Sequence, residues 1–192
     1  FIGTVFSDLK EYAALVAQQK AAGADFIKIM ISGLMDFDHY GVLSEEPLSA
    51  EEIKELIHIA HEEGFAVMAH ANGARTVEAA AEAGVDSVEH GAYLDEAALW
   101  AMKEAGTVWV PTLSTIGNLR GKGRFNEEAV QGIFASTAEK LREFAAMGGT
   151  IAPGSDAGAW AVTHGCESEA PLLREILGAD ADAILEKGAR AI

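Results

Sequence analysis

The sequence predicts an α/β fold of about five βα units whose parallel strands lie in one sheet. Short apolar runs follow small-residue turns five times, and stretches with helical spacing of apolar residues separate the runs. This alternation is typical of parallel sheets, because two parallel neighbours need a long crossover, usually a helix, to connect them. Most of the runs also end on Lys, His or Asp, and the carboxyl ends of parallel strands are where such sheets carry their chemistry.

The five apolar runs predict strands over residues 26–31, 65–70, 85–90, 107–112 and 149–155. Amphipathic spacing predicts helices over residues 8–22, 49–63, 74–83, 95–105, 126–147, 166–177 and 180–191. Gly23 is expected to end the first helix, and Ser49 with Glu52 forms a capping box that begins the second. The loop over residues 32–48 is long for a βα connection, and loops of this length often face a substrate. A second loop, over residues 113–124, contains several glycines and cations, and both loops are expected to select the substrate.

The number of strands points to part of a closed barrel. Eight strands and about 250 residues make a (β/α)8 TIM barrel, whereas this chain has 192 residues and about five predicted strands. A doubly wound sheet would also accommodate the βα repeat. We expect residues 1–192 to form a single, partial (β/α)8 TIM-barrel domain that belongs to a longer chain. The alternative is that two copies cover each other's exposed edge strands, so a homo-oligomer is expected.

The composition excludes several classes of partner. The formal net charge of −16 opposes binding to nucleic acid or to an anionic membrane surface. We find no stretch with the length and hydropathy of a transmembrane helix, and no signal peptide. The single cysteine, Cys166, excludes an intramolecular disulfide and fits a reducing compartment. We therefore expect a cytoplasmic protein with a small-molecule substrate.

Four residues at the ends of the predicted strands form a candidate metal site: Lys28, His70, His90 and Asp156. His70 and His90 each lie six residues after the glycine that begins their run, so we expect equivalent positions on neighbouring strands. Imidazole nitrogen and carboxylate-type oxygen suit Zn²⁺ and similar ions. Asp156 lies in a glycine-lined turn, from which it can ligate the metal and accept a proton from water.

Lys28 has three interpretations. Its ammonium can extend to solvent at the strand end, it can be a Schiff-base nucleophile, or its amine can react with CO₂ to give a carbamate ligand able to bridge two metals. The run Gly-Ala-Asp-Phe-Ile-Lys28 resembles the strand with the Schiff-base lysine of deoxyribose-phosphate-type aldolases. A metal-independent lyase is therefore an alternative, although it would have no use for His70, His90 and Asp156.

Four motifs together resemble the amidohydrolase superfamily, and within it the imidazolonepropionase-like branch that includes Xaa-Pro and other dipeptidases. They are Phe-Ile-Lys28-Ile, His70-Ala-Asn-Gly, Val-Glu-His90-Gly and Gly-Ser-Asp156-Ala-Gly. Enzymes of this family are (β/α)8 barrels that hydrolyse amide, ester or related bonds through metal-activated water. The resemblance implies a metal-dependent hydrolase acting on amide (C–N) bonds, including peptide bonds.

The same resemblance implies a role for each candidate residue. Lys28 would be a carbamylated bridging ligand, His70 and His90 metal ligands, and Asp156 a metal ligand and the general acid/base. His164 and Asn72 would lie near the substrate. Apart from the resemblance, the cations of the loop over residues 113–124, Arg120 among them, would hold a carboxylate as a dipeptidase requires, or would simply be solvated.

The cofactor would be one or two divalent ions, with Zn²⁺ as the first choice over Mn²⁺ and Fe²⁺. The substrate would be a dipeptide, an N-acyl amino acid or a cyclic amide. The family's first strand supplies a His-x-His pair to one metal, and this sequence has no such pair. A catalytically inactive, truncated scaffold is therefore a further alternative.

Overall fold

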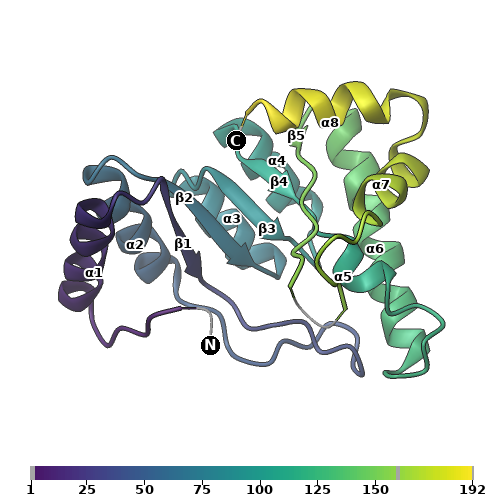
Figure 1. The fold of residues 1–192 in the computed structure, drawn as a ribbon, viewed down its shortest axis with the longest axis horizontal. Helices are drawn as coiled ribbons and strands as arrows, with labels where there is room; N and C mark the ends of the chain where they lie inside the picture. Colours follow the sequence, from purple (N-terminus) through teal and green to yellow (C-terminus); the bar gives the residue numbers. More distant parts are fainter. Residues whose placement is uncertain (1–2, 159–160, 192) are drawn as a thin grey trace.

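One parallel sheet of five strands organises the chain in the computed structural model, which describes residues 3–158 and 161–191 (Figure 1). The strands are β1 (Phe26–Met30), β2 (Ala66–Ala71), β3 (Ser87–His90), β4 (Val108–Val110) and β5 (Thr150–Ile151). Each strand lies beside the next one in the sequence and runs parallel to it. The strand order does not reverse within the described part of the chain, as it would in a doubly wound sheet, so the fold is a segment of a (β/α)8 barrel.

One helix precedes β1, helices connect successive strands, and further helices follow β5. They are α1 (Leu9–Ala22), α2 (Ala50–Glu62), α3 (Ala74–Glu82), α4 (Glu96–Ala105), α5 (Ser114–Gly117), α6 (Glu127–Ala146), α7 (Glu169–Leu177), the 3-10 helix η1 (Gly178–Asp180) and α8 (Ala181–Ala189). The predicted signals at α1 and α2 are confirmed: Gly23 ends α1 with a φ of 78°, and Ser49 and Glu52 form the capping box of α2. Among the described residues, no helix has the length and hydropathy to cross a membrane.

The helices pack against one face of the sheet, and the other face carries the polar groups. Alternate residues of each strand point to the helical side and join the apolar core. These strand residues are Ile27, Ile29, Val67, Ala69, Ala71, Val88, Trp109 and Ile151. On the opposite face Val108, Val110 and Ala152 form a small separate cluster. That face is open at β1, where Phe26 is 49% and Met30 62% exposed.

The bounds of some elements differ from the prediction. β4 is shorter than the strand predicted over 107–112, because Pro111 has no N–H to donate and Thr112 has a φ of +47°. β5 is shorter than the strand predicted over 149–155. The loop predicted over 113–124 contains the short helix α5, and α7 and α8 are shorter than the helices predicted for them. These differences leave the order of the elements as predicted.

Helix α8 packs directly on the backbone of β5. A Cβ built on Gly188 would overlap the carbonyl group of Ile151 and would lie 2.9 Å from the Cα of Ala152. Gly188 is buried in the last turn of α8, where helix propensity alone favours alanine, by up to about 1 kcal/mol. The close approach to β5 therefore explains the glycine at this position.

We predict that Gly188→Ala destabilises the chain by about 1–3 kcal/mol, the usual cost of overpacking, because backbone atoms cannot move aside as a side chain can. Urea unfolding followed by circular dichroism measures the change. Lys187→Ala, at the exposed neighbouring position, is the control and should leave the midpoint within error. A Gly188→Ala variant as stable as the parent chain would show that helix propensity outweighs the contact.

Candidate functional site

His70 and His90 meet at the carboxyl ends of β2 and β3. Their ring centroids are 4.5 Å apart, the ring planes make an angle of 63°, and the residues are 5% and 8% exposed. The prediction of equivalent positions is wrong by one residue, because His70 pairs with Glu89 and His90 pairs with Ala71. Regular alternation would send His90 to the helical face. Its φ of +70° breaks the alternation, and the ring meets His70 instead.

Each histidine commits one ring nitrogen to a hydrogen bond. His70 Nε2 lies 3.2 Å from the carbonyl oxygen of Gly33, which follows β1, and His90 Nδ1 lies 2.7 Å from the hydroxyl oxygen of Thr112, which follows β4. Because a carbonyl oxygen only accepts, the bond to Gly33 requires a hydrogen on His70 Nε2. Asn72 Nδ2, which only donates, then bonds to Gly33 O and not to this ring nitrogen. The second nitrogen of each ring is then open to a ligand, which is the usual arrangement of metal-binding histidines.

Both histidines are neutral at neutral pH. Burial lowers the pKa of His90 to about 3, with further lowering by His70 and Lys28. Burial also lowers the pKa of His70, and the hydrogen bond to Gly33 opposes this effect. Since neutral imidazole is the form that binds metal ions, the pair can accept a metal without first losing protons.

Lys28 and Asp156 lie within electrostatic range of the pair. The charge of Lys28 lowers the pKa of both histidines, and the charge of Asp156 raises the pKa of His70. Lys28 lies on the same face of the sheet as His70. It pairs with Met68, two residues before His70 on β2. Asp156 is exposed, in the turn after β5, with a φ of +52°. The structure thus brings His70 and His90 into contact and places Lys28 and Asp156 near them.

Glu89 was not predicted as a site residue, although it lies on the same face as His70 and pairs with it across the sheet. Its side chain is buried, and its Oε1 accepts a hydrogen bond from Ser87 Oγ at 2.8 Å. Burial raises the pKa of this carboxyl group. The available signal was a carboxylate inside an apolar run, because an acidic residue in a fully buried strand has a role other than solvation.

Asn72, predicted to contact the substrate, is fully buried, and its polar groups bond to other groups of the protein. Its backbone N–H donates to Ser32 Oγ at 2.9 Å, and its Oδ1 accepts from the N–H of Ala92 at 3.0 Å. Its Nδ2 lies 3.3 Å from both Gly33 O and His70 Nε2. In this conformation Asn72 ties the segments after β1, β2 and β3 together beneath the histidine pair.

The other two predicted substrate-binding residues, Arg120 and His164, lie in different surroundings. The guanidinium carbon of Arg120 lies 3.7 Å from the ring centroid of Phe134 on α6, so this side chain is engaged in a cation–π contact. His164 is exposed and lies against Gly158, in the turn that contains Asp156. His164 is thus near a predicted catalytic residue, whereas Arg120 is held on α6.

The β1–α2 loop (residues 31–49) crosses the end of the sheet at which the histidines meet. Its middle is fixed at the start of α6, where Asn126 N donates to Asp38 Oδ1 at 2.8 Å and the rings of Phe37 and Phe125 are 5.4 Å apart. Figure 1 shows this segment along the lower edge of the sheet, running toward α5 and α6. The loop is therefore fixed at both the histidine pair and the start of α6, and its substrate-facing role stays a prediction.

Tyr40 in this loop constrains the sequence of α6. Its ring meets Tyr93 edge-on, with centroids 5.3 Å apart, and it also lies over Gly132 in the middle of α6. A Cβ on Gly132 would lie 3.0 Å from Tyr40 Cδ2. Glycine inside a helix costs about 1 kcal/mol relative to alanine. The space that Gly132 leaves for the ring of Tyr40 accounts for a glycine at this position.

Tyr93 presents an unpaired polar group under the same loop. Its hydroxyl oxygen is buried without a hydrogen-bond partner among the residues that the structure describes. Burial raises the pKa of this phenol, and the Gly41 amide offsets part of the rise without reaching hydrogen-bonding geometry. A buried hydroxyl group without a partner, three residues after His90 in the chain, is a feature that calls for an explanation.

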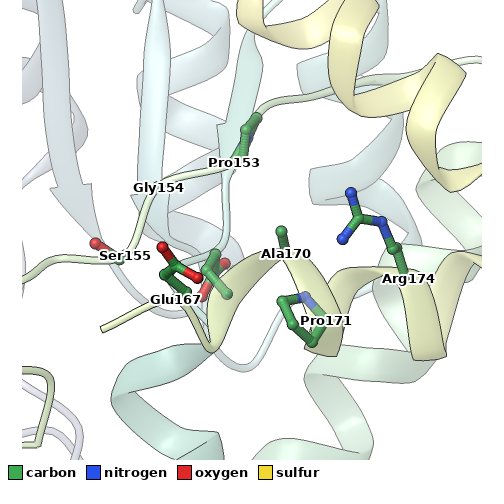
Figure 2. A pocket seen from close by; sticks show the side chains of 8 residues that line it. Pro153, Gly154, Ser155, Glu167, Ala170, Pro171 and Arg174 are labelled. Atoms are coloured by element: carbon green, nitrogen blue, oxygen red, sulfur yellow. The ribbon is translucent and has the colours of Figure 1, made fainter. Parts of the chain in front are cut away.

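A pocket of about 550 Å³ lies between the segment after β5 and the start of α7 (Figure 2). Ser155 and Glu167 lie toward one end of this pocket and Arg174 toward the other, with apolar residues of α7 between them. The lining includes neither His70 nor His90. We therefore place the chemistry at the histidine pair and regard the pocket as a neighbouring depression.

The histidine pair fits a divalent metal, but it does not complete a site. Two neutral imidazoles in contact, each with one nitrogen open, suit Zn²⁺ better than Mg²⁺ or Ca²⁺, which prefer oxygen ligands. Within residues 3–158 and 161–191, no three His, Cys, Asp or Glu side chains lie close enough together to hold a metal ion. Lys28 as a carbamate and Asp156 are the candidates in this chain for a further ligand, since both act electrostatically on His70.

Comparisons with known proteins agree with this geometry. A profile described as the amidohydrolase family matches residues 3–176. Ochratoxinase of Aspergillus niger is 32% identical over 159 residues, which are 77% of this chain and 32% of that protein. The crystal structure of the same ochratoxinase has a TM-score of 0.78 at 28% identity, covering 96% of this chain and 42% of that one.

A second solved structure is similar over the same extent. A Xaa-Pro dipeptidase with bound methionine in its active site has a TM-score of 0.77 at 29% identity, covering 96% of this chain and 46% of that one. The chain thus spans between about a third and a half of the length of these relatives.

We predict that His90 makes the metal-free chain less stable in acid. Its pKa of about 3 in the folded chain lies below the ordinary value of 6.5, so below pH 6.5 the unfolded chain binds a proton that the folded chain does not. The free energy of unfolding then falls by about 1.4 kcal/mol per pH unit for this group. Urea unfolding between pH 7 and pH 4.5 should show a steeper loss for the parent chain than for His90→Gln. Parallel curves would contradict the burial of a neutral His90.

We predict that Gly132→Ala and Tyr40→Ala are coupled. In the Tyr40→Ala background, Gly132→Ala should stabilise the chain by about 1 kcal/mol through helix propensity. With Tyr40 present the gain should shrink or change sign, because the new Cβ displaces the ring. A double-mutant cycle of unfolding free energies measures the difference. Equal gains in both backgrounds would show that Tyr40 does not depend on Gly132.

Proposed function

Because this chain belongs to the amidohydrolase family, we propose that it supplies the part of a metal-dependent amide hydrolase that carries Lys28, His70, His90 and Asp156. The observation that carries the proposal is the contact of two buried, neutral imidazoles at the carboxyl ends of neighbouring parallel strands. Family membership favours this reaction over the Schiff-base lyase, which would leave the histidine pair without a role.

The metal ligands are proposed from the open positions of the side chains. His70 and His90 would bind through the ring nitrogens that Gly33 and Thr112 leave free. Lys28 would contribute oxygen after carbamylation, since its ammonium has no lone pair to offer. One or two divalent ions, with Zn²⁺ preferred for imidazole ligands, would complete the site. A bound ion would lower the pKa of water and polarise the scissile carbonyl.

Proton transfer is assigned to Asp156. Its carboxylate is exposed and interacts electrostatically with His70, so it can accept the proton of the attacking water and return it to the leaving amine. Glu89 is a less suitable base, because its side chain is buried and bonded to Ser87. We assign to Glu89 a supporting electrostatic role on the same face of the sheet.

The proposed substrate is a small amide such as a dipeptide, an N-acyl amino acid or a cyclic amide. The β1–α2 loop would exclude water on one side, and the rings of Tyr40 and Tyr93 would form an apolar wall. The unpaired Tyr93 hydroxyl would bind a polar group of the substrate. His164 stands beside the turn of Asp156 and would contact the substrate from that side. The similarity to a Xaa-Pro dipeptidase supports this class.

The remaining proposals concern the setting of the site. Residues 1–192 would act as a single partial-barrel domain in the cytoplasm. Phe26, Met30 and Leu34 are 49%, 62% and 55% exposed at the β1 side, and such an apolar edge needs cover. The cover would come from the rest of a longer chain or from a second copy in a homo-oligomer.

We predict that His70→Ala and His90→Ala abolish metal binding. The purified chain is reconstituted with Zn²⁺ and bicarbonate, and the metal content per folded chain is measured by elemental analysis. The parent chain should hold about one equivalent or more, and each variant should lose most of it because two ligands cannot replace three. His58→Ala removes an exposed histidine of α2 and is the matched control, expected to keep the full metal content.

Two outcomes would contradict the proposal. Full metal content in both His70→Ala and His90→Ala would place the metal elsewhere. A parent chain that folds but binds no metal after reconstitution would show that these side chains do not form a working centre in this chain.

A further inference from the structure

Thr112 has a backbone conformation that its side chain disfavours. It follows Pro111 after β4 and has a φ of +47°. For a β-branched residue this left-handed region is a true outlier, with a cost of about 1–3 kcal/mol. Glycine or asparagine would relieve the cost. A threonine kept in such a position indicates that its hydroxyl group has a use there.

The hydroxyl group of Thr112 is directed at His90. The distance between Thr112 Oγ1 and His90 Nδ1 is 2.7 Å, and both residues are buried. The carbonyl oxygen of His90 accepts a second bond from the same segment, from Trp109 Nε1 at 2.9 Å. His90 is therefore held at its backbone and at its ring by residues of β4 and of the turn after it.

The turn that carries Thr112 is itself fixed from a distant part of the chain. The buried carboxyl group of Glu169, on α7, accepts hydrogen bonds from Leu113 N at 2.9 Å, Ser114 N at 2.6 Å and Ser114 Oγ at 2.8 Å. These bonds fix the two residues after Thr112. The strained conformation is thus held in place by contacts outside the turn, as strained functional positions require.

We propose that Thr112 is a positioning residue that sets the tautomer of His90. In this assignment the hydroxyl oxygen accepts the hydrogen of Nδ1 and its own hydrogen points away from the ring, so the lone pair of the ring lies on Nε2, the nitrogen that is open to a ligand. Without this acceptor the hydrogen is free to move to Nε2 and block it. A partner on one ring nitrogen commonly fixes the tautomer and orientation of a ligand histidine. The role in metal binding rests on the proposed function, but the tautomer does not.

The test is nitrogen-15 NMR of the histidine rings in the metal-free chain near neutral pH, with His90 assigned from His90→Gln. The parent chain should show His90 with its hydrogen on Nδ1. Thr112→Val keeps the β-branched shape but removes the hydroxyl, and it should move the hydrogen wholly or partly to Nε2. Thr112→Ser keeps the hydroxyl and should restore the parent spectrum.

Two further variants separate positioning from stability. Thr115→Val removes a neighbouring hydroxyl that bonds to the backbone of Thr112 at 2.8 Å and leaves the His90 contact intact, so the tautomer should stay unchanged. Thr112→Gly relieves the strained φ and should unfold no earlier than the parent chain, yet it should lose the Nδ1 tautomer. The glycine variant keeps the test decisive if the valine variant fails to fold.

Zinc affinity gives a second readout. Thr112→Val should weaken Zn²⁺ binding by about 10–100-fold, the usual effect of losing such a partner, while Thr112→Ser stays within a few-fold of the parent. A parent chain with the hydrogen on Nε2, or an unchanged tautomer in both Thr112→Val and Thr112→Gly, would overturn the assignment. If no variant and no parent binds zinc, the proposed function fails while the tautomer still decides the role of Thr112.

Discussion

Backbone strain at the carboxyl ends of the strands is the constraint on which the candidate site depends. In the described part of the chain, the non-glycine residues with positive φ are His90, Tyr93, Thr112 and Asp156. Each lies at or just beyond the end of β3, β4 or β5. The positive φ of His90 lets its ring meet His70, and that of Thr112 lets its hydroxyl reach His90. The candidate site therefore depends on residues whose backbone angles differ from those of a regular strand. Such strained conformations persist only where the surrounding structure is rigid.

That rigidity comes from the helical side of the sheet. Trp109 is fully buried, its ring packs against Phe144 of α6 with centroids 5.7 Å apart, and its indole N–H bonds to His90. A Cβ on Gly91 would lie 2.5 Å from the indole nitrogen, so the residue after His90 must be glycine for the indole to fit. The side chain of Trp109 thus connects the apolar core to the backbone of His90.

The sequence predicts the fold well, because strand and helix periodicity are local properties. The five βα units, their order and the capping signals of α1 and α2 follow from patterns of a few residues. The identity of the histidine pair also follows, since strand ends in a parallel sheet share one edge. The offset of one residue between His70 and His90 does not follow, because it depends on a backbone angle that no pattern encodes.

The parts that sequence reasoning missed depend on contacts between distant segments. Helix α5 lies in a stretch predicted as a loop, and its first N–H groups are bonded by Glu169 more than fifty residues later. The cation–π contact of Arg120 with Phe134 on α6 is likewise not visible in the sequence, and the binding of a carboxylate by Arg120 stays a prediction. Thr112 carries no local signal that separates it from an ordinary core residue, whereas the carboxylate of Glu89 inside an apolar run was a signal that the sequence analysis did not use. The order of the strands has a separate consequence for synthesis. Since each strand after β1 pairs with its predecessor in the chain, the sheet can grow in the direction in which the ribosome releases it, and α8 can pack on β5 once that strand has joined the sheet.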